Sequence, residues 1–482
     1  VSNPEIYEKV KDFAGLIPSL ERIVTINGKG EDSMEEMEKR GEKNPIPATH
    51  PDPDDIAVLI YTSGTTGEPK GVLLSHGNLT CNSRAGLNMY PEITEGGASL
   101  SILPWAHSLG QTAEFYSMIS IGGAIGIMER VETIAEDLAL VRPTWLIAVP
   151  RVFNKIYDGL WARVNERGGL AKKLFVMGVE SARKKRELAE MGRSCFFTNL
   201  KVTVADRIVF KKIRDRLGGR LMGSLTGGAA MNVEVARFFL DIGIPLYNCY
   251  GLTETSPAVS MNASFDYRLG SVGRAIEDVR ISIDSSVVGE DSGDGEIVVY
   301  GPNVMKGYHN KPEETAKVMT ADGGFRTGDR GRLDEDGFLY LTGRIKEQYK
   351  LENGKFVFPA GLEEEIRLVS FVENAMVYGD GKPYNVCLVA PDFEVLGKYA
   401  KGHNLSADPG ELVKNKDVQN LIGNAITDAL KGQYGNYEIP QKFIFISEGF
   451  TTENGFLTQT MKLKRRTIIE HYGDRIEGLY NN

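Results

Sequence analysis

A run of hydroxyl side chains and glycines between residues 61 and 71 offers the groups that a phosphate chain needs. It follows the apolar stretch from Ile56 to Ile60, which predicts a buried strand. Small hydroxyls, backbone N–H groups and glycines suit phosphate binding, and Lys70 adds a cation. The run lacks the spacing of a Walker A loop, and a Ser/Thr/Gly turn is the simpler interpretation. The residues that offer hydroxyls or glycine backbone are Thr62, Ser63, Gly64, Thr65, Thr66 and Gly67.

A second motif, residues 250–255, ends the predicted strand Pro245–Cys249. Open α/β sheets bind ligands at the carboxyl ends of their strands. Tyr250 is suited to stacking on adenine, Thr253 to bonding a phosphate and Glu254 to holding Mg²⁺ through oxygen. A strand-to-loop turn with an incidental acid is the alternative.

Three further candidates are weaker on their own. The small residues 227–230 follow the predicted strand Leu221–Thr226, and they would let a flat ring approach the backbone. Asp329 stands near glycines and is suited to accept both ribose hydroxyls, although an Asp in a turn is common. His107 follows Pro104 and Trp105, where a lone histidine is more often structural.

In this order, from residue 61 to residue 465, the motifs resemble those of the adenylate-forming enzymes, the acyl-CoA synthetase and luciferase superfamily. Within it, the chain resembles the long-chain fatty acid–CoA ligase branch, and the resemblance covers nearly the whole chain. It implies that a carboxylic acid is activated by ATP to acyl-AMP, with release of pyrophosphate, and is then passed to CoA. ATP, Mg²⁺ and CoA are the cofactors that it implies.

The resemblance also implies roles for single residues at the phosphates. The loop 62–67 and Lys70 would contact the phosphates of ATP, and Thr253 would bind a phosphate. Glu254 would be the Mg²⁺ ligand, with Thr62 as a second one. The ring of His107 would lie near the phosphate and the carboxylate of the substrate.

At the nucleoside end, the resemblance implies an adenine contact for Tyr250, with Gly251 beside it in the same element. Gly228 and Ala229 would belong to the element that binds adenine and the acyl group. Asp329 would bind ribose.

Later motifs imply a moving part. Arg344 would contact ribose or phosphate, and Lys346 would be the hinge between a large and a small domain. Lys350 and Gly354 would face the thiolation site after the hinge turns. Lys462 matches the family's catalytic lysine, whose ammonium would stabilise negative charge as pyrophosphate leaves. Gln459 and Met461 depart from the usual pattern around it, which leaves Lys464 as a less favoured candidate.

The pattern of elements predicts an α/β fold with mostly parallel, helix-covered sheets. We expect a large domain over 1–345, with a barrel-like part over 282–345, and a small α+β domain over 346–482. The predicted strands are Leu100–Leu103, Thr144–Val149, Leu221–Thr226, Pro245–Tyr250, Ile281–Ile283, Gly295–Tyr300, Phe338–Thr342, Ala375–Tyr378, Asn385–Ala390 and Lys442–Ile446. A helix is expected over Asp417–Lys431.

Residues 1–55 are interpreted as the C-terminal end of an α/β unit. Ile23–Ile26 predicts a short strand, and the charged, proline-containing segment Gly28–Asp55 predicts a loop. In the family that the chain resembles, a substantial α/β region precedes the phosphate loop. We therefore expect that part of this region is missing from the chain.

Composition is that of an ordinary water-soluble globular protein, with 482 residues, 41% hydrophobic and 25% charged. The four cysteines lie far apart, which argues against a disulfide framework or a zinc site and fits a reducing compartment. The six histidines show no metal-ligand spacing. The longest apolar stretch is too short to span a bilayer, and a cytoplasmic location is expected.

One segment differs in charge from the rest. Residues 151–220 carry a net charge of +11 within a chain of −9. An acidic protein with a basic, largely helical face could contact anionic lipid headgroups at a membrane surface. A solvated helix pair with an ordinary charge excess is the simpler interpretation, and the sparse aromatic residues argue against nucleic acid.

The same segment and the stretch Leu351–Lys355 resemble the long-chain branch, which favours a medium- or long-chain fatty acid as substrate. An aromatic or alicyclic acid stays open, because one sequence does not place the pocket. Two alternatives to a CoA ligase also stay open. One is an adenylating enzyme that uses a carrier-protein thiol or oxidises the adenylate, and the other is a nucleotide-binding regulator without turnover.

Overall fold

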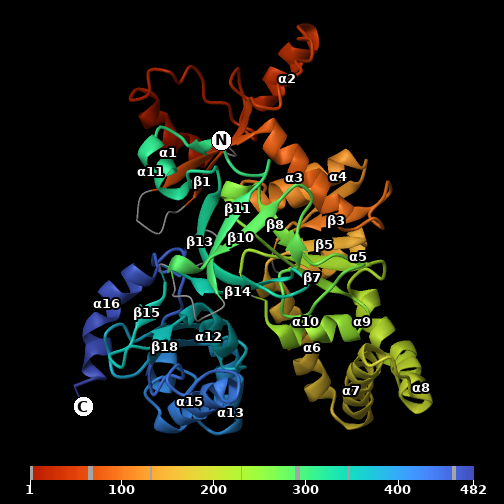
Figure 1. The fold of residues 1–482 in the computed structure, drawn as a ribbon, viewed down its shortest axis with the longest axis vertical. Coiled ribbons are helices and arrows are strands. Elements are labelled where there is room, and N and C mark those ends of the chain that lie inside the picture. The colour runs from red at the N-terminus through yellow and green to blue at the C-terminus, as the bar shows by residue number, and fades with distance from the viewer. Residues whose placement is uncertain are drawn as a thin grey trace. The chain divides into compact units, whose positions relative to one another are not determined.

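The computed structural model describes residues 4–62, 69–130, 133–229, 231–287, 294–345, 347–458 and 463–481 (Figure 1). The chain divides into two compact units, residues 1–52 and 53–482. Some of the predicted site residues lie outside the described residues. They are Ser63, Gly64, Thr65, Thr66, Gly67, Lys346 and Lys462.

The first unit is more helical than its sequence predicted. Its helices are α1 (Pro4–Ala14) and α2 (Met34–Lys43). The hydroxyl of Ser33 caps α2 by accepting a hydrogen bond from the backbone N–H of Glu36 at 3.3 Å. The loop prediction for Gly28–Asp55 is therefore wrong over Met34–Lys43, because it overlooked this cap. The strand prediction for Ile23–Ile26 is also wrong, since Thr25 makes only an isolated bridge.

The second unit contains a seven-stranded sheet in the order β4-β3-β5-β6-β7-β8-β9. Its strands are β3 (Ala98–Ser101), β4 (Ala124–Ile127), β5 (Trp145–Ala148), β6 (Gly223–Thr226), β7 (Leu246–Gly251), β8 (Ala258–Met261) and β9 (Arg274–Ala275). The strands from β4 to β7 pair in parallel, and β8 and β9 continue the sheet antiparallel. Every residue of β3, β5 and β6 is buried, as expected of parallel strands covered on both faces. The predicted α/β class is confirmed.

Helices and helical turns surround this sheet (Figure 1). They are α3 (His76–Asn88), η1 (Leu109–Tyr116), α4 (Ser117–Ser120), α5 (Ile134–Val141), α6 (Pro150–Arg167), α7 (Gly169–Glu190), α8 (Phe196–Ala205), η3 (Asp206–Phe210), α9 (Lys211–Arg216), α10 (Val233–Asp241) and η4 (Thr253–Thr255). A buried aromatic cluster of Phe153, Phe175, Phe238 and Phe239 joins α6, α7 and α10. The segment 151–220 is helical, as predicted.

Two smaller sheets are antiparallel. Their elements are β1 (Ile56–Thr62), β2 (Lys70–Ser75), β12 (Gly307–Tyr308), β10 (Arg280–Asp284), η5 (Ser285–Val287), β11 (Gly295–Tyr300), α11 (Pro312–Val318), β13 (Phe325–Leu333) and β14 (Leu339–Arg344). In the described residues, the sheet β10-β11-β13-β14 runs in linear order. Strand β1 lies at an edge of β1-β2-β12, so Ile56 and Leu59 are exposed, and the prediction of a buried strand is wrong for them.

The C-terminal part has its own core. Its elements are β15 (Tyr349–Lys350), β16 (Phe356–Val357), α12 (Pro359–Ile366), β17 (Val372–Tyr378), β18 (Val386–Pro391), α13 (Phe393–Gly402), α14 (Pro409–Leu412), α15 (Lys416–Leu430), β19 (Lys442–Phe445) and α16 (Arg465–Gly478). Strand β18 is wholly buried between β17 and β19. Asn415 caps α15 by accepting from the N–H groups of Asp417 and Val418, so the predicted helix forms there.

Candidate active site

Three residues that the sequence predicted to bind the nucleotide lie in contact where β7 approaches β13 and β14. The hydroxyl of Tyr250 donates a hydrogen bond to Oδ2 of Asp329 at 2.8 Å. The guanidinium Nε of Arg344 lies 3.0 Å from Oδ1 of the same carboxylate. The register of the two strands sets Asp329 opposite Arg344. We call Tyr250, Asp329 and Arg344 the ribose-side cluster.

Burial and neighbouring charge shift the pKa values of Tyr250 and Arg344 in the ribose-side cluster. Tyr250 and Asp329 are buried, and burial, reinforced by the Asp329 charge, raises the pKa of the Tyr250 hydroxyl well above its usual value. Tyr250 therefore remains a donor at neutral pH. The charge of Asp329 also raises the pKa of Arg344. The result is a buried carboxylate held between one donor and one cation.

A second group of residues lies around the base of the phosphate loop. Lys70 pairs with Oε2 of Glu314 on α11 at 2.5 Å, and its ammonium lies 5.1 Å from the centre of the Tyr308 ring. The hydroxyl of Tyr308 donates to Oε1 of Glu254 at 2.9 Å. Thr62 faces Lys70 across the β1–β2 ladder. We call Lys70, Glu314, Tyr308 and Glu254 the phosphate-side cluster.

Two charges of the phosphate-side cluster, those of Lys70 and Glu314, are already paired. Hydrogen bonds from Lys317 and Lys70 lower the pKa of Glu314 to about 2. Burial, with a smaller effect of Glu254, raises the pKa of Tyr308 above its usual value. Lys70 is only 14% exposed. The predicted phosphate-binding cation is thus engaged with a carboxylate that the sequence did not single out.

Backbone geometry explains two of the predicted glycines. A Cβ on Gly251 would lie 1.8 Å from the carbonyl oxygen of Pro257, so a side chain does not fit there. Gly228 adopts φ +83°, a left-handed conformation that glycine tolerates best. Gly228 and Ala229 are exposed at the end of β6, next to β7 in the sheet.

Thr253, the predicted phosphate-binding residue, lies near Ser108. The hydroxyl oxygens of the two residues are 3.4 Å apart.

Two buried asparagines hold the loop that carries Thr253 and Glu254. The side-chain amide of Asn82 donates to the carbonyl oxygens of Thr255 and Ala258, at 3.3 and 2.8 Å. Asn303 donates to the same two oxygens, at 3.2 and 2.9 Å. Sequence reasoning missed both residues. An asparagine far away in sequence carries no local signal, although Asn82 on the buried face of α3 was a polar residue in need of partners.

His107 stands just before the helical turn η1, and its Nδ1 lies 3.2 Å from the backbone nitrogen of Leu109, accepting its N–H. A buried chain of polar groups supports this loop. Ser101 donates to Oε2 of Glu114 at 2.7 Å and accepts from Trp105 Nε1 at 2.9 Å. Glu114 is fully buried, and burial raises its pKa. Glu114 was also missed, because its glutamate looks like an ordinary surface acid in the sequence.

Lys350 and Gly354 lie in the β15–β16 hairpin of the C-terminal part, on a sheet separate from those of the two clusters. The Lys350 ammonium lies 5.3 Å from the Phe356 ring centre. Gly354 closes the hairpin with φ +82°. The structure therefore places Lys350 at the end of strand β15 and Gly354 in the turn between β15 and β16.

The donor set can be tested for Mg²⁺. Among the described residues, no group of three or more His, Cys, Asp or Glu side chains could hold a metal ion by itself. Glu254 offers one carboxylate, whose Oε1 already accepts from Tyr308. Mg²⁺ in nucleotide sites is commonly bound by one or two carboxylates together with substrate phosphates. Glu254 fits an ion that arrives with a nucleotide, and it does not fit a free-standing metal cage.

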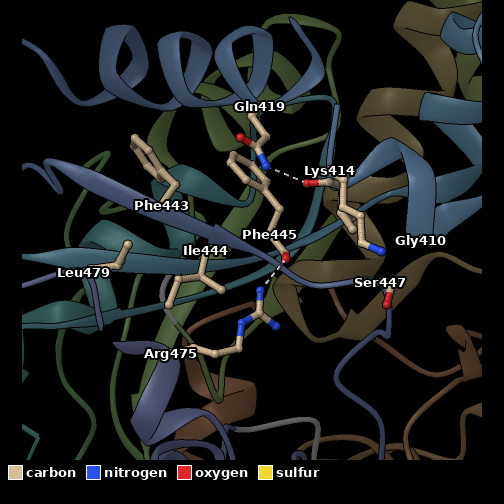
Figure 2. Close-up of a pocket in the computed structure, with 10 residues that line it drawn as sticks. Gly410, Lys414, Gln419, Phe443, Ile444, Phe445, Ser447, Arg475 and Leu479 are labelled. Atoms are coloured by element: carbon tan, nitrogen blue, oxygen red, sulfur yellow. Dashed lines mark hydrogen bonds between the residues drawn. The ribbon is translucent and has the colours of Figure 1, made fainter. Parts of the chain in front are cut away.

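A hollow of about 550 Å³ lies elsewhere, on the C-terminal part beside β19 (Figure 2). Arg475 donates to the carbonyl oxygen of Phe445 at 3.1 Å within it. Its polar lining includes Lys414, Gln419 and Ser447. None of the predicted site residues that the structure describes lines this hollow.

The comparisons with known proteins agree with this geometry. Residues 2–309 match the family model of the AMP-binding enzymes, and residues 346–482 match the model of the AMP-binding enzyme C-terminal domain. This chain belongs to the AMP-binding enzymes. The resemblance to adenylate-forming acyl-CoA synthetases that the motifs predicted is confirmed.

Curated relatives of this AMP-binding enzyme are named as fatty-acid ligases. The long-chain-fatty-acid–CoA ligase FadD15 of Mycobacterium bovis is 32% identical over 98% of this chain and 78% of its own length. Fatty acyl-CoA synthetase A of Dictyostelium discoideum is 33% identical over 93% of this chain and 67% of its own length. Among solved structures, the adenylation domain of a carboxylate reductase from Mycobacterium chelonae aligns with a TM-score of 0.76, at 25% identity, over 99% of this chain and 72% of that one.

Proposed function

We propose that this AMP-binding enzyme activates a medium- or long-chain fatty acid with ATP and transfers the acyl group to CoA. The observation that carries the proposal is the ribose-side cluster, in which a buried carboxylate faces a donor and a cation. The names of the relatives, long-chain-fatty-acid–CoA ligase and fatty acyl-CoA synthetase, support the substrate class.

The chemistry has two balanced steps. A carboxylate oxygen of the acid bonds to the α-phosphorus of ATP, and the bond from that phosphorus to the bridging oxygen breaks, so that pyrophosphate leaves with the electron pair. The sulfur of CoA then bonds to the carbonyl carbon of the acyl-AMP. The bond between that carbon and the phosphate oxygen breaks, and AMP leaves while the thiol proton passes to solvent or a base.

We assign the nucleoside end of ATP to the ribose-side cluster. Asp329 would accept both ribose hydroxyls, because an ionised carboxylate accepts hydrogen bonds through both of its oxygens, and Tyr250 and Arg344 hold this one in place. Arg344 would hold the carboxylate in place through its contact at 3.0 Å. Gly228 and Ala229 would allow adenine to approach the backbone, since neither carries a bulky side chain.

The phosphate end requires an exchange of partners. Lys70 would leave Glu314 and bind the triphosphate, whose higher negative charge competes for the ammonium. Thr62, Thr253 and the loop 63–67 would bind phosphate oxygens, as the motif resemblance implies. Mg²⁺, when bound, would neutralise the leaving phosphates, and Glu254 with Thr62 would hold it.

The remaining assignments come from the motif alone. Lys462 would stabilise the charge that develops on the α-phosphate, His107 would lie beside the reacting carboxylate, and Lys346 would be the hinge. Lys350 and Gly354 would face CoA after the hinge turns. Lys462→Ala should abolish acyl-AMP formation yet spare thioester formation from supplied acyl-AMP, and an equal loss of both would remove this role.

Two solved neighbours support one alternative to CoA as the acceptor of the acyl group. The adenylation domain that aligns here belongs to a carboxylate reductase, and another solved neighbour is an adenylation domain joined to a PCP domain. A carrier-protein thiol could therefore replace CoA. The CoA dependence of thioester formation separates the two acceptors.

The test of the proposed function is AMP release with ATP, Mg²⁺ and CoA across acids from acetate to palmitate, with benzoate and cyclohexanecarboxylate included. We expect a maximum at medium or long alkyl chains. A maximum at a ring acid would keep the two chemical steps and overturn the fatty-acid assignment. Release that does not depend on any acid would overturn the enzyme assignment.

Contact with an anionic membrane surface through residues 151–220 is a further part of this proposal. The net charge of +11 on that segment supports it, because basic side chains are attracted to anionic headgroups. None of the helices in the described chain is long and apolar enough to cross a membrane.

A further inference from the structure

Helix α8 and the turn η3 that follows it carry a stripe of exposed apolar side chains. The stripe contains Phe196, Phe197, Leu200, Val204 and Ile208, and we call it the α8 ridge. Phe196, Leu200, Val204 and Ile208 follow one another at four-residue intervals, which places them on one face of the helix. Phe196 and Phe197 are 74% and 72% exposed.

The two phenylalanines have little else to pack on. Their rings contact each other edge to face, with centroids 5.7 Å apart. The opposite side of the helix is buried against its neighbours through Thr198 and Ala205. Helix α8 packs beside α7 at one margin of the second unit (Figure 1). An apolar stripe of this size on a helix that is already packed on its other side marks an interaction surface.

Basic side chains surround the ridge. Lys201, Arg207 and Lys211 are exposed on the same helical segment. Two acids of this helical region are engaged with other cations. Asp206 pairs with Arg214 at 2.7 Å, and Glu190 pairs with Arg186 at 3.3 Å. The face that carries the ridge is therefore apolar and positively charged together.

We propose that the α8 ridge docks this enzyme on an anionic lipid bilayer. Apolar side chains would enter the boundary between headgroups and acyl chains, and the lysines and arginine would meet the headgroup charges. Charge complementarity selects this occupant, because the segment 151–220 carries +11 within a chain of −9. The biological purpose, access to an acid dissolved in the bilayer, rests on the proposed function, whereas the docking itself does not.

The test is co-sedimentation of the full chain with vesicles of phosphatidylglycerol and phosphatidylcholine in equal parts, and with phosphatidylcholine alone. We expect binding to the mixed vesicles that weakens with salt, and little binding to phosphatidylcholine. F196S/F197S should weaken binding by about tenfold or more, because two exposed rings no longer enter the bilayer. F265S is the matched control, since Phe265 is 69% exposed on a loop outside the segment.

A second pair of variants tests the charges. K201E/K211E should weaken binding by about tenfold or more at low salt. K401E, at an exposed lysine of the C-terminal part, should leave it unchanged. Circular dichroism checks that each variant folds. Octanoate, which is soluble without a bilayer, should be activated equally by all of them, so a failure of acid activation is distinguished from a failure of docking.

Three results would overturn the docking proposal. The first is equal vesicle binding by the wild type, F196S/F197S and K201E/K211E. The second is wild-type binding that is absent or does not weaken with salt. The third is a wild-type dimer in sedimentation velocity that F196S/F197S dissolves without any effect on vesicles, which would assign the ridge to a second copy of the chain.

Discussion

The ribose-side cluster and the phosphate-side cluster differ in how far they are prepared for a nucleotide. In the first, Asp329 is buried and held by Tyr250 and Arg344. In the second, the cation that should meet phosphate, Lys70, is tied to Glu314. In one cluster the protein contacts orient the group assigned to the ligand, whereas in the other a protein partner must be exchanged for the ligand.

The difference teaches that charge pairs in one binding site can have opposite roles. Arg344 orients the group that would bind ribose, so the pair persists in the complex. Glu314 occupies the group that would bind phosphate, so the pair must open. We therefore expect variants of the ribose-side cluster to have larger effects than variants of the phosphate-side cluster.

The largest effect is expected for Asp329→Ala. It removes the acceptor of two charge-assisted hydrogen bonds and leaves Arg344 without its partner, which should lower kcat/KM for ATP by about 100-fold or more. Asp329→Asn is the matched control, because it keeps the shape and loses the charge. Steady-state kinetics and AMP binding by calorimetry measure both. Near-normal AMP affinity in the alanine variant would show that the ribose binds elsewhere.

Glu254→Gln should come next. It removes the carboxylate charge while keeping an oxygen for Tyr308, so the Mg²⁺ concentration needed for half-maximal activity should rise by about 10-fold. Tyr308→Phe is the control, since it removes one hydrogen bond and no charge. A Mg²⁺ titration of AMP release compares them. Identical Mg²⁺ dependence in the wild type and Glu254→Gln would remove Glu254 from the metal site.

A smaller and more diagnostic effect is expected from the pair Lys70 and Glu314. Lys70→Ala should raise KM for ATP by about 10-fold through loss of one charged contact. Glu314→Gln should lower KM for ATP or leave it unchanged, because it frees the lysine for phosphate. A rise in KM for Glu314→Gln as large as that for Lys70→Ala would show that the intact pair, not the free lysine, is needed.

The smallest effect concerns acid stability. The pKa of Glu314 is about 2 in the folded chain, below its ordinary 4.5. A lowered folded-state pKa adds stability above the unfolded value, and this stability is lost as the pH falls from about 4.5 toward 2. Thermal unfolding should therefore show the wild type slightly above Glu314→Gln at pH 7, with the gap closing near pH 2. A gap that grows as the pH falls would contradict the pairing.

The sequence predicted the members of the ribose-side cluster, but not how they touch. Tyr250, Asp329 and Arg344 were each named from a motif, and the β13–β14 register that sets the last two opposite each other followed only from the structure. Glu314, Tyr308, Asn82 and Asn303 were missed, because their partners lie far away in the chain. The residues next to each of them in the sequence carry no signal for a contact with a distant part of the chain.

The fold shows the same division. The parallel strand β5 was predictable, because a strand buried on both faces is often a continuous apolar run, whereas β6 is equally buried although it contains Gly223, Ser224 and Thr226. The exposure of Ile56 and Leu59 was not predictable, because exposure depends on strand order, and β1 lies at a sheet edge. Helix α2 was missed although its Ser33 cap, with Glu36 three residues later, was visible in the sequence.

The most direct test of the central claim follows an oxygen atom. The enzyme would be given palmitate labelled with ¹⁸O in both carboxylate oxygens, together with ATP, Mg²⁺ and CoA, and AMP and palmitoyl-CoA would be analysed by mass spectrometry. Because the acid oxygen bonds to the α-phosphorus and leaves with AMP, the account predicts one ¹⁸O in each AMP and one in each thioester. AMP without label, formed alongside palmitoyl-CoA, would contradict activation through an acyl-adenylate.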